Sequence, residues 1–242
     1  GGGQGIGRGI ALELAKAGFN VVVADLNADN AEAVATEIKV LGQQALALAI
    51  DVTDTPSIND AVQQTLKHFA RIDIVINNAG VCPEKLETDT TLADFDLCQN
   101  VNLKSVWAVS QAVIPHFKAR KAGKIINIAS TAGRKGDAYV PAYCASKAGV
   151  ISLTQSLAMA LGCDNINVNA ICPGLVKTPL TEQIWDVDSN PNCLDDFVRK
   201  QTLLGRLITP EDIGHAVVFL ASSLAKNITG QALNVNGGEF MS

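Results

Sequence analysis

The chain has 242 residues, of which 48% are hydrophobic and only 5% are aromatic, and its formal net charge is −5. This length fits one large α/β domain or two small ones, with enough apolar residues for a sizeable core. The acidic balance, without a long basic run, argues against a nucleic-acid partner, and no run of about 18 apolar residues predicts a membrane-spanning helix. No signal-peptide pattern opens the chain and the six cysteines form no CxxC pair, so we expect a cytoplasmic protein with reduced thiols.

Short apolar runs alternate with amphipathic stretches along the whole chain. Periodicity after the opening glycines predicts a first helix, and strands are expected at 20–25, 45–50, 72–77, 124–129, 166–171 and 231–235. Further helices are expected at 28–41, 56–69, 92–121 with Pro115 as a kink site, 143–161 and 210–221. This alternation predicts an α/β fold with a doubly wound, mostly parallel sheet and helices on both faces, as in Rossmann-like domains. No linker or repeat divides residues 1–242, so we expect one domain.

The least regular stretch of the sequence is an insertion at about 175–205. It carries two prolines and a tryptophan, Pro179, Pro191 and Trp185, and an acidic cluster made of Asp186, Asp188, Asp195 and Asp196. A long irregular insertion in a compact domain is commonly functional or mobile. A substrate lid and a plain surface excursion are both compatible with this pattern.

The chain opens on a glycine-rich loop, Gly1–Gly7. Gly5 and Gly7 would let backbone amides and a helix N-terminus approach a pyrophosphate closely. A flexible tag or linker is the alternative, but the helical periodicity behind the loop favours cofactor binding. Such a loop normally follows a strand at the centre of the sheet. We expect that first strand, with several N-terminal residues, to be missing from this sequence, and a sheet without it to be unstable.

Two aspartates at strand ends are candidates for binding adenosine. Asp25 lies 18 residues after the glycine loop, where a carboxylate can accept hydrogen bonds from ribose hydroxyls and repel a 2′-phosphate. No Lys or Arg follows at 26–28, which favours NAD over NADP. Arg8 is counter-evidence, since it could reach a 2′-phosphate. The alternative interpretation of Asp25 is a solvated aspartate at a strand end. Asp51 and Val52 close the next strand and would meet the adenine ring, but an isolated aspartate there is more often a cap or turn former.

Tyr143 and Lys147 lie four residues apart at the start of a predicted helix, so they share one face with Cβ atoms about 5–6 Å apart. A neighbouring ammonium favours the phenolate and makes tyrosine usable as an acid/base. Tyr-x-x-x-Lys is a frequent chance pattern, but this copy comes 13 residues after Ser130. Ser130 ends a predicted strand and could hold a substrate oxygen or make only a local backbone bond. Asn102 is unfavourable inside a helix, which indicates a specific role, although spacing does not distinguish it from Asn100.

The sequence predicts no metal site. The three histidines, His68, His116 and His215, lack the spacing of metal ligands. Residues 186–190 resemble the start of a calcium loop, but Pro191 stands where a glycine is needed.

Together these motifs resemble the short-chain dehydrogenase/reductase family along essentially the whole chain. The likeness rests on Gly1-x-x-x-Gly5-Ile6-Gly7, Asn77-Asn78-Ala79-Gly80, Asn102, Ser130, Tyr143-x-x-x-Lys147 and Pro173-Gly174. The departures are the first strand and the threonine that usually precedes Gly1. The resemblance implies an NAD(P)-dependent oxidoreductase acting on CH–OH groups, commonly a homotetramer joined through the helices at 92–121 and 143–161.

The resemblance also implies a role for each matching residue. Tyr143 would exchange a proton with the substrate oxygen, and Ser130 would orient that oxygen. Lys147 would bind the nicotinamide ribose and lower the tyrosine pKa, and Asn102 would hold a water that links Lys147 to solvent. Thr178 and the backbone near Val176 would bind the carboxamide. With the residues above, the predicted NAD contacts are Gly1, Gln4, Gly5, Ile6, Gly7, Asp25, Asp51, Val52, Asn78, Ala79, Gly80, Tyr143, Lys147, Pro173, Gly174, Val176 and Thr178.

Local similarity favours a polyol or vicinal diol as the small-molecule substrate. The stretches 172–179 and 202–207 look like acetoin/butanediol dehydrogenases, whereas 133–137 and 235–242 look like sorbitol and galactitol dehydrogenases. We therefore predict hydride transfer between nicotinamide and a secondary alcohol or ketone of this class.

Two alternatives remain. A 3-oxoacyl-[acyl-carrier-protein] reductase shares every motif, but it typically prefers NADP and docks an acidic carrier on a basic patch. Asp25 and the acidic cluster at 186–196 argue against it. A non-catalytic NAD-binding regulator is hard to reconcile with an intact set of Ser130, Tyr143 and Lys147.

Overall fold

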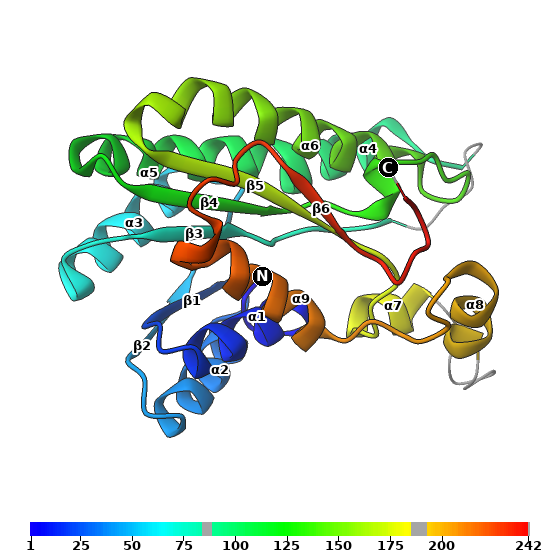
Figure 1. Ribbon diagram of the computed structural model, residues 1–242, viewed down its shortest axis with the longest axis horizontal. Helices are drawn as coiled ribbons and strands as arrows, with labels where there is room; N and C mark the ends of the chain where they lie inside the picture. Colours follow the sequence, from blue (N-terminus) through cyan, green and yellow to red (C-terminus); the bar gives the residue numbers. More distant parts are fainter. Residues whose placement is uncertain (84–88, 185–192, 242) are drawn as a thin grey trace.

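The computed structural model describes residues 1–83, 89–184 and 193–241, and it is built from parallel strands covered by helices on both faces (Figure 1). The strands are β1 (Val21–Asp25), β2 (Ala45–Ala49), β3 (Ile74–Asn77), β4 (Gly123–Ile128), β5 (Ile166–Pro173) and β6 (Ala232–Val235). The α-helices are α1 (Gly5–Lys16), α2 (Ala28–Val40), α3 (Thr55–Phe69), α4 (Leu92–Cys98), α5 (Ser105–Arg120), α6 (Pro141–Leu161), α7 (Pro179–Ile184), α8 (Cys193–Gln201) and α9 (Pro210–Ala221). The predicted Rossmann-like α/β fold is therefore confirmed.

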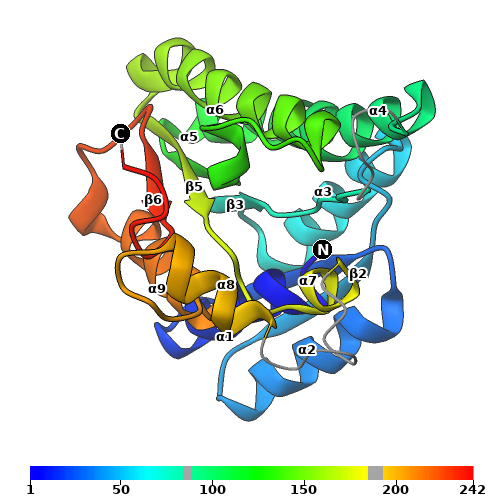
Figure 2. The same ribbon diagram turned by 90° about the vertical axis from the view of Figure 1, so that its right-hand side faces the viewer.

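The strands are parallel and carry small aliphatic residues because both faces of the sheet are buried. Successive side chains of a strand point to opposite faces. In β4, Ile125 packs into a cluster with Phe117 of α5 and Leu157 of α6. Its neighbour Ile126 packs into a second cluster with residues of α1, α2 and α9. Figure 2 shows the same two layers, with α5 and α6 on one side of the strands and α1, α2 and α9 on the other.

The predicted element bounds agree with the structure to within a few residues, and two regions differ. The helix expected at 92–121 is divided by a π-helical segment, Gln99–Lys104, that joins α4 to α5. Pro115 lies inside α5, which continues to Arg120 without a break. At 175–205 the sequence predicted an irregular insertion, but α7 and α8 lie there. Asp195 and Asp196 of the acidic cluster stand in the first turn of α8, where carboxylates favour the helix dipole, whereas the rest of the cluster lies outside the described residues.

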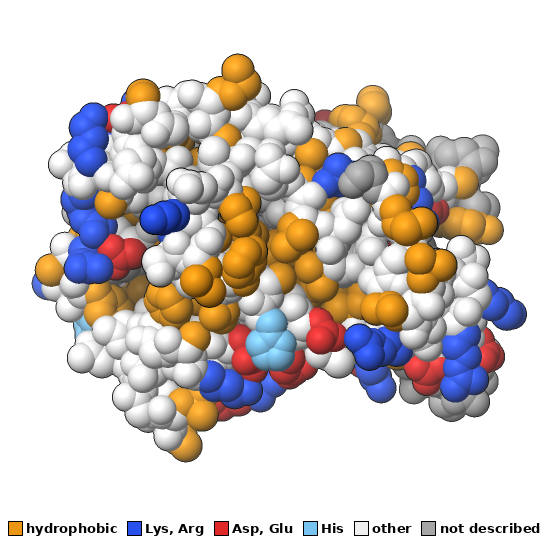
Figure 3. Space-filling view, viewed as in Figure 1, with side chains coloured by type: hydrophobic (Ala, Val, Ile, Leu, Met, Phe, Trp, Pro, Cys, Tyr) orange, Lys and Arg blue, Asp and Glu red, His pale blue; other side chains and the backbone are white. Residues whose placement is uncertain are grey.

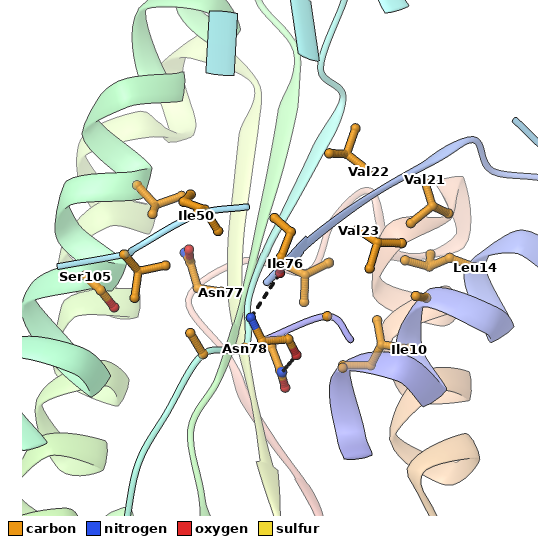
Figure 4. Close-up of a pocket in the computed structure, with 18 residues that line it drawn as sticks. Ile10, Leu14, Val21, Val22, Val23, Ile50, Ile76, Asn77, Asn78 and Ser105 are labelled. Carbon is orange, nitrogen blue, oxygen red and sulfur yellow. Dashed lines mark hydrogen bonds between the residues drawn. The ribbon is translucent and has the colours of Figure 1, made fainter. Parts of the chain in front are cut away.

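The sheet is in two parts. β1 pairs only with β2, and the other described strands form the order β3-β4-β5-β6. The parallel edges of β1 and β3 face each other across two adjoining cavities of ≈ 160 and ≈ 500 Å³. Figure 4 shows the smaller one, with Val21, Val22 and Val23 on one side and Ile50 and Ile76 on the other. Among the described strands, the sheet is therefore interrupted between β1 and β3.

Three further sequence predictions can be compared with the described residues. All six cysteines are free thiols. Among the described residues, no cluster of His, Cys, Asp or Glu has the arrangement of a metal site. No described helix combines the length and the apolar content that crossing a membrane requires.

Candidate active site

The tyrosine and the lysine predicted to act together lie one turn apart at the start of α6. Pro141 occupies the first turn of this helix, where its missing N–H costs no hydrogen bond. Lys147 Nζ lies 5.5 Å from the centroid of the Tyr143 ring. The Lys147 side chain is only 3% exposed, and its ammonium donates a 2.8 Å hydrogen bond to the carbonyl oxygen of Ile128, at the end of β4. The lysine is thus fixed between the helix and the sheet.

Burial governs the protonation of this pair. Although part of the Tyr143 ring is accessible, it lies among many protein atoms, and this burial raises its pKa far above the usual value. The nearby thiols add to the increase, and a hydrogen bond with Ser130 only partly offsets it. Burial lowers the pKa of Lys147 to about 8. The expected lowering of the tyrosine pKa by Lys147 is therefore not what the structure gives, because desolvation of the phenolate dominates.

Ser130 follows β4 and reaches the same tyrosine. It is the N-cap of a 3-10 turn, Thr131–Gly133, and its Oγ accepts a hydrogen bond from Ala132 N at 3.1 Å. A second hydrogen bond joins its side chain to Tyr143. The local backbone bond is therefore confirmed, and the same serine contacts the candidate acid/base, whereas its role toward a substrate oxygen stays a prediction.

Asn102 connects the loop after β3 to α6. Its side chain is fully buried in the π-helical segment, whereas Asn100 is exposed. Asn102 Oδ1 accepts from Val81 N at 2.8 Å, and Nδ2 donates to Val81 O at 2.9 Å and to Ser146 Oγ at 3.0 Å. π-Helical turns are frequent at functional sites because the extra residue redirects a side chain inward. Of the two asparagines, the structure brings Asn102 to the site.

The glycine loop lies directly beside the loop after β3. α1 begins at Gly5, which has a left-handed φ of 51°. A Cβ on Gly7 would stand 1.8 Å from Gly1 O, so only glycine fits there. Asn78 Nδ2 donates a 2.6 Å hydrogen bond to the same Gly1 O. Backbone of the loop and the N-terminus of a long helix are thus held in the close packing that phosphate binding needs.

The segment after β5 completes the same edge of the sheet. Thr178 is 8% exposed, and a Cβ added to Gly5 would touch its side chain at 3.4 Å. Val176 is buried and forms an isolated parallel bridge with Ile208. Gly80 is packed so that an added Cβ would lie 3.4 Å from Lys147 Nζ. The glycine loop, the loop after β3, the segment after β5 and the start of α6 therefore surround one region.

Comparisons with known proteins agree with this arrangement. The family model described as "Enoyl-(Acyl carrier protein) reductase" matches residues 1–239. A 3-oxoacyl-[acyl-carrier-protein] reductase FabG of Thermotoga maritima is 34% identical over 97% of this chain and 93% of its own length. A short-chain dehydrogenase/reductase of Armillaria gallica is 37% identical over 98% of this chain and 93% of its own. The solved 7α-hydroxysteroid dehydrogenase complexed with NADH and 7-oxo glycochenodeoxycholic acid has a TM-score of 0.92 and 35% identity, covering 98% of this chain and 91% of that one.

The chain belongs to the short-chain dehydrogenase/reductase family. It is accordingly an oxidoreductase of a family that acts on CH–OH and keto groups. These relatives include 3-oxoacyl-[acyl-carrier-protein] reductases and a hydroxysteroid dehydrogenase. The predicted likeness to polyol and butanediol dehydrogenases in particular is not supported by them.

Within this short-chain dehydrogenase/reductase, Asp25 is held beside the glycine loop. Its side chain is 11% exposed, and it accepts 2.9 Å hydrogen bonds from the backbone N atoms of Gly3 and Asn27. Burial would raise the pKa of Asp25, but the hydrogen bonds from the backbone N–H groups of Asn27 and Gly3 favour the carboxylate, and the pKa lies below its usual value. Arg8, the counter-evidence for NAD, is engaged elsewhere, since its Nε donates to Glu37 Oε1 at 3.0 Å.

The second aspartate is placed differently. Asp51 is exposed, and its Oδ1 accepts from Thr53 N at 2.8 Å and from Thr53 Oγ1 at 2.6 Å. These bonds make it a turn former, which was the alternative interpretation of this residue. Val52 lines the cavity between β1 and β3.

Sequence reasoning missed Ser146, which lies between two of the predicted residues. It is fully buried, and its Oγ donates to Tyr143 O at 2.7 Å while accepting from Asn102 Nδ2. Its position three residues after Tyr143 was the available signal, because residues three apart lie on one helix face. The short-chain dehydrogenase/reductase site is therefore supported by a buried polar connection between α6 and the π-helical segment.

Proposed function

We propose that the protein is an NAD(H)-dependent oxidoreductase that interconverts a ketone and a secondary alcohol. The substrate class best supported is a 3-oxoacyl thioester, because that is the activity named for several relatives. The observation that supports the reaction is the arrangement of Tyr143, Lys147 and Ser130, with the phenol bonded to Ser130 and the ammonium 5.5 Å from its ring. An arrangement of this kind argues against the non-catalytic NAD-binding regulator.

The glycine loop fits a dinucleotide. An alanine side chain at Gly7 would overlap Gly1 O, and the loop leads directly into the N-terminus of the 12-residue helix α1. We assign the diphosphate to this loop, with Gln4 and Ile6 as its remaining contacts. Asn78, Ala79 and Gly80 would line the central part, and Pro173, Gly174, Val176 and Thr178 would hold the nicotinamide. When bound, the nicotinamide supplies or accepts the hydride.

The residues of the chain would handle the proton and the orientation. Ser130 would donate a hydrogen bond to the substrate carbonyl oxygen, and Tyr143 would transfer its phenolic proton to that oxygen as the alcohol forms. A tyrosine with a raised pKa keeps its proton at neutral pH, which suits ketone reduction. Lys147, fixed on Ile128 O, would hold the ribose and supply positive charge near the phenolate that remains. Asn102 would keep the loop after β3 aligned with α6 and hold the proposed water.

The environment of Asp25 supports NAD(H) over NADP(H). A carboxylate that stays ionised at the end of β1 accepts bonds from ribose hydroxyls and repels a 2′-phosphate. The nearby cation that could offset this repulsion, Arg8, is paired with Glu37. The hydroxysteroid dehydrogenase with similar structure was solved with NADH.

A polyol or vicinal diol is the second candidate substrate. The observation that favours it is acidic surface charge, because Asp195 and Asp196 are exposed in the first turn of α8 and the chain carries a net charge of −5. An acidic carrier protein would be repelled by such a surface. A small acyl thioester presents less negative charge than an acidic carrier protein and is therefore repelled less.

A substrate panel tests these proposals. Each substrate is assayed with NAD(H) and with NADP(H). The panel has two thioesters, acetoacetyl-CoA and acetoacetyl-acyl-carrier protein, and three alcohols, sorbitol, galactitol and 2,3-butanediol. We expect reduction of acetoacetyl-CoA with NADH, slower reduction of the acyl-carrier-protein thioester, and little turnover with NADPH. Turnover confined to the polyols would replace the thioester by the second candidate. Strong preference for NADPH would overturn the role of Asp25, and no turnover with any substrate, despite NADH binding, would favour the regulator.

We also propose that the protein assembles as a homotetramer. Exposed apolar side chains follow α4, α5 and α6: Leu92, Phe95, Leu97, Trp107 and Met159. A second group, Phe219, Leu224 and Leu233, is exposed on the opposite layer. Figure 3 shows hydrophobic side chains gathered over β6 and α9 on this face. Two separate apolar surfaces allow two kinds of isologous contact, as a tetramer with three twofold axes requires.

Light scattering after size-exclusion chromatography measures the mass of the assembly, and a monomer would contradict this proposal.

A further inference from the structure

The chain after β6 folds back onto the segments that flank the site. Residues 236–240, here called the C-terminal turn, contain Gly237 and Gly238 with left-handed φ values of 62° and 85°. The turn is closed internally, because Asn236 Nδ2 donates to Phe240 O at 2.9 Å and Glu239 N donates to Asn236 O at 3.0 Å. In both ribbon views the segment after β6 runs near α8 and the chain that follows it (Figures 1 and 2).

Three substrate-side segments contact this turn. Glu239 Oε1 forms a 2.8 Å ion pair with Lys135, in the loop that follows Ser130. The other carboxylate oxygen lies against Gly174, where an added Cβ would stand only 2.8 Å from it. The residues after α8 are attached as well, since Leu204 N donates to Gly237 O at 3.0 Å.

The carboxylate of this ion pair lies in a largely buried position, where a charge without a partner costs free energy. The Glu239 side chain is only 9% exposed, whereas Lys135 is 39% exposed. A carboxylate removed from water needs a partner, so the position of Lys135 and of its loop is coupled to the C-terminal turn. Two further bonds tie the same elements together: Thr131 Oγ1 donates to Pro173 O at 3.1 Å, and Gly174 N donates to Val235 O at 3.1 Å.

We propose that Glu239, paired with Lys135, is a positioning residue that holds the nicotinamide-side segment 173–178 against the loop that carries Ser130. This inference rests on the proposed function, because it assigns segment 173–178 to the nicotinamide half of NAD(H). Glu239 touches neither substrate nor cofactor in this proposal. It acts through Gly174 and through Lys135, so its loss affects the nicotinamide half of the cofactor and leaves the adenosine half in place.

The test compares two ligands on the same variants. NADH reports the whole cofactor site, whereas ADP-ribose reports only the adenosine and diphosphate part at the glycine loop. For Glu239→Gln we expect a dissociation constant for NADH about tenfold higher than for the wild type, and an unchanged constant for ADP-ribose, as for the loss of one charged hydrogen bond. Lys135→Met should weaken NADH at least as much, because it leaves the carboxylate buried and unpaired.

A double variant and a control sharpen the comparison. Lys135→Met combined with Glu239→Gln should bind NADH no more weakly than Lys135→Met alone, since both changes act on one interaction. Asp164→Asn is the matched control. Asp164 also forms an ion pair, with Lys121, but it lies just before the start of β5, at the end of the strand that is away from Gly174. This control should leave both constants unchanged.

The possible results separate the two proposals. Unchanged NADH binding in Glu239→Gln would overturn the positioning role. An equal loss of affinity for NADH and for ADP-ribose would overturn it too, because that result indicates that the whole cofactor site is loosened. Circular dichroism identifies a variant that does not fold, and Glu239→Asp, which keeps the charge, should then restore part of the NADH affinity. A wild-type protein that binds no NADH would instead overturn the proposed function.

Discussion

The two parts of the sheet hold the two halves of the proposed site in different ways. β4 and β5 are each paired on both sides and packed between apolar clusters, and the lysine of the reacting pair is bonded to the end of β4. β1, which carries Asp25, is paired on one side only and faces a cavity on the other. The glycine loop is joined to Asn78 and Asp25 by hydrogen bonds, and the helix that follows it, α1, packs in one apolar cluster with α9. The residues proposed for proton transfer thus lie beside the continuous part of the described sheet, whereas Asp25 and the glycine loop, proposed to bind the dinucleotide, lie on β1 and at the start of α1.

The largest expected effect separates catalysis from binding. Tyr143→Phe removes the phenolic proton and should lower kcat by roughly 10²–10⁴-fold, the usual contribution of general acid–base catalysis. The dissociation constant for NADH should stay within about twofold, because the ring and its packing remain. Tyr139→Phe is the control, since Tyr139 is 60% exposed. Full turnover in Tyr143→Phe would remove this tyrosine from the mechanism.

The second prediction compares the two parts of the sheet directly. Backbone amides of β4 and β5 should exchange with solvent roughly 100-fold more slowly than those of β1, because opening β1 breaks pairing with one neighbour only. Saturating NADH should slow exchange in β1 more than in β4, since a ligand that binds the folded form stabilises the segment it contacts. Hydrogen exchange followed by mass spectrometry measures both. Equal protection of β1 and β4 would show that the cavity does not weaken the edge of β1.

The third prediction concerns only the cofactor half. Asp25→Asn removes the ionised carboxylate and should lower the preference for NAD over NADP, as a ratio of kcat/KM values, by about tenfold. Asp51→Asn is the control, because Asp51 is bonded to Thr53 and lies exposed. Weaker binding of both cofactors by Asp51→Asn would instead support the predicted contact of Asp51 with adenine, which NAD and NADP share.

Features that depend on a few consecutive residues could be predicted from the sequence, whereas features that depend on distant contacts could not. The spacing of Tyr143 and Lys147 predicted one helix face because helix geometry alone determines it. The glycine loop and the strands were predictable for the same reason, since each depends on a few consecutive residues. The π-helical segment was not, because nothing local in 99–104 distinguishes it from an α-helix. It became visible only through the bonds from Asn102 to Val81 and Ser146.

The remaining differences come from long-range contacts and desolvation. The pairing of Lys135 with Glu239 joins residues 104 positions apart, and no pattern in either segment indicates it. The pKa of Tyr143 was expected to fall because Lys147 is adjacent, but the expectation left out the burial that the fold imposes on both groups. α7 and α8 were taken for an irregular insertion because both are short, and short helices give weak periodicity.

The smallest expected effect is on stability, and it comes from the well-paired part of the sheet. The pKa of Lys147 is about 8 in the folded chain and near 10.5 when the chain is unfolded, so the unfolded state binds more protons between these values. Stability due to this group therefore rises with pH across that window and is lowest below pH 8. The full difference corresponds to about 3 kcal/mol.

Lys147→Met should consequently stabilise the protein while abolishing turnover. At pH 7 the gain is on the order of 1–2 kcal/mol, because losing the hydrogen bond to Ile128 O offsets part of the relief from burial. The gain should disappear as the pH approaches about 10, where the buried lysine is neutral in the wild type. Lys118→Met is the control, since this half-exposed lysine pairs with Asp164 at the surface, and its loss should leave stability nearly unchanged at both pH values. Denaturant unfolding at pH 7 and pH 10 distinguishes the two lysines. A destabilised Lys147→Met at pH 7 would mean that its ammonium strengthens the fold, and that catalysis and stability do not compete at this residue.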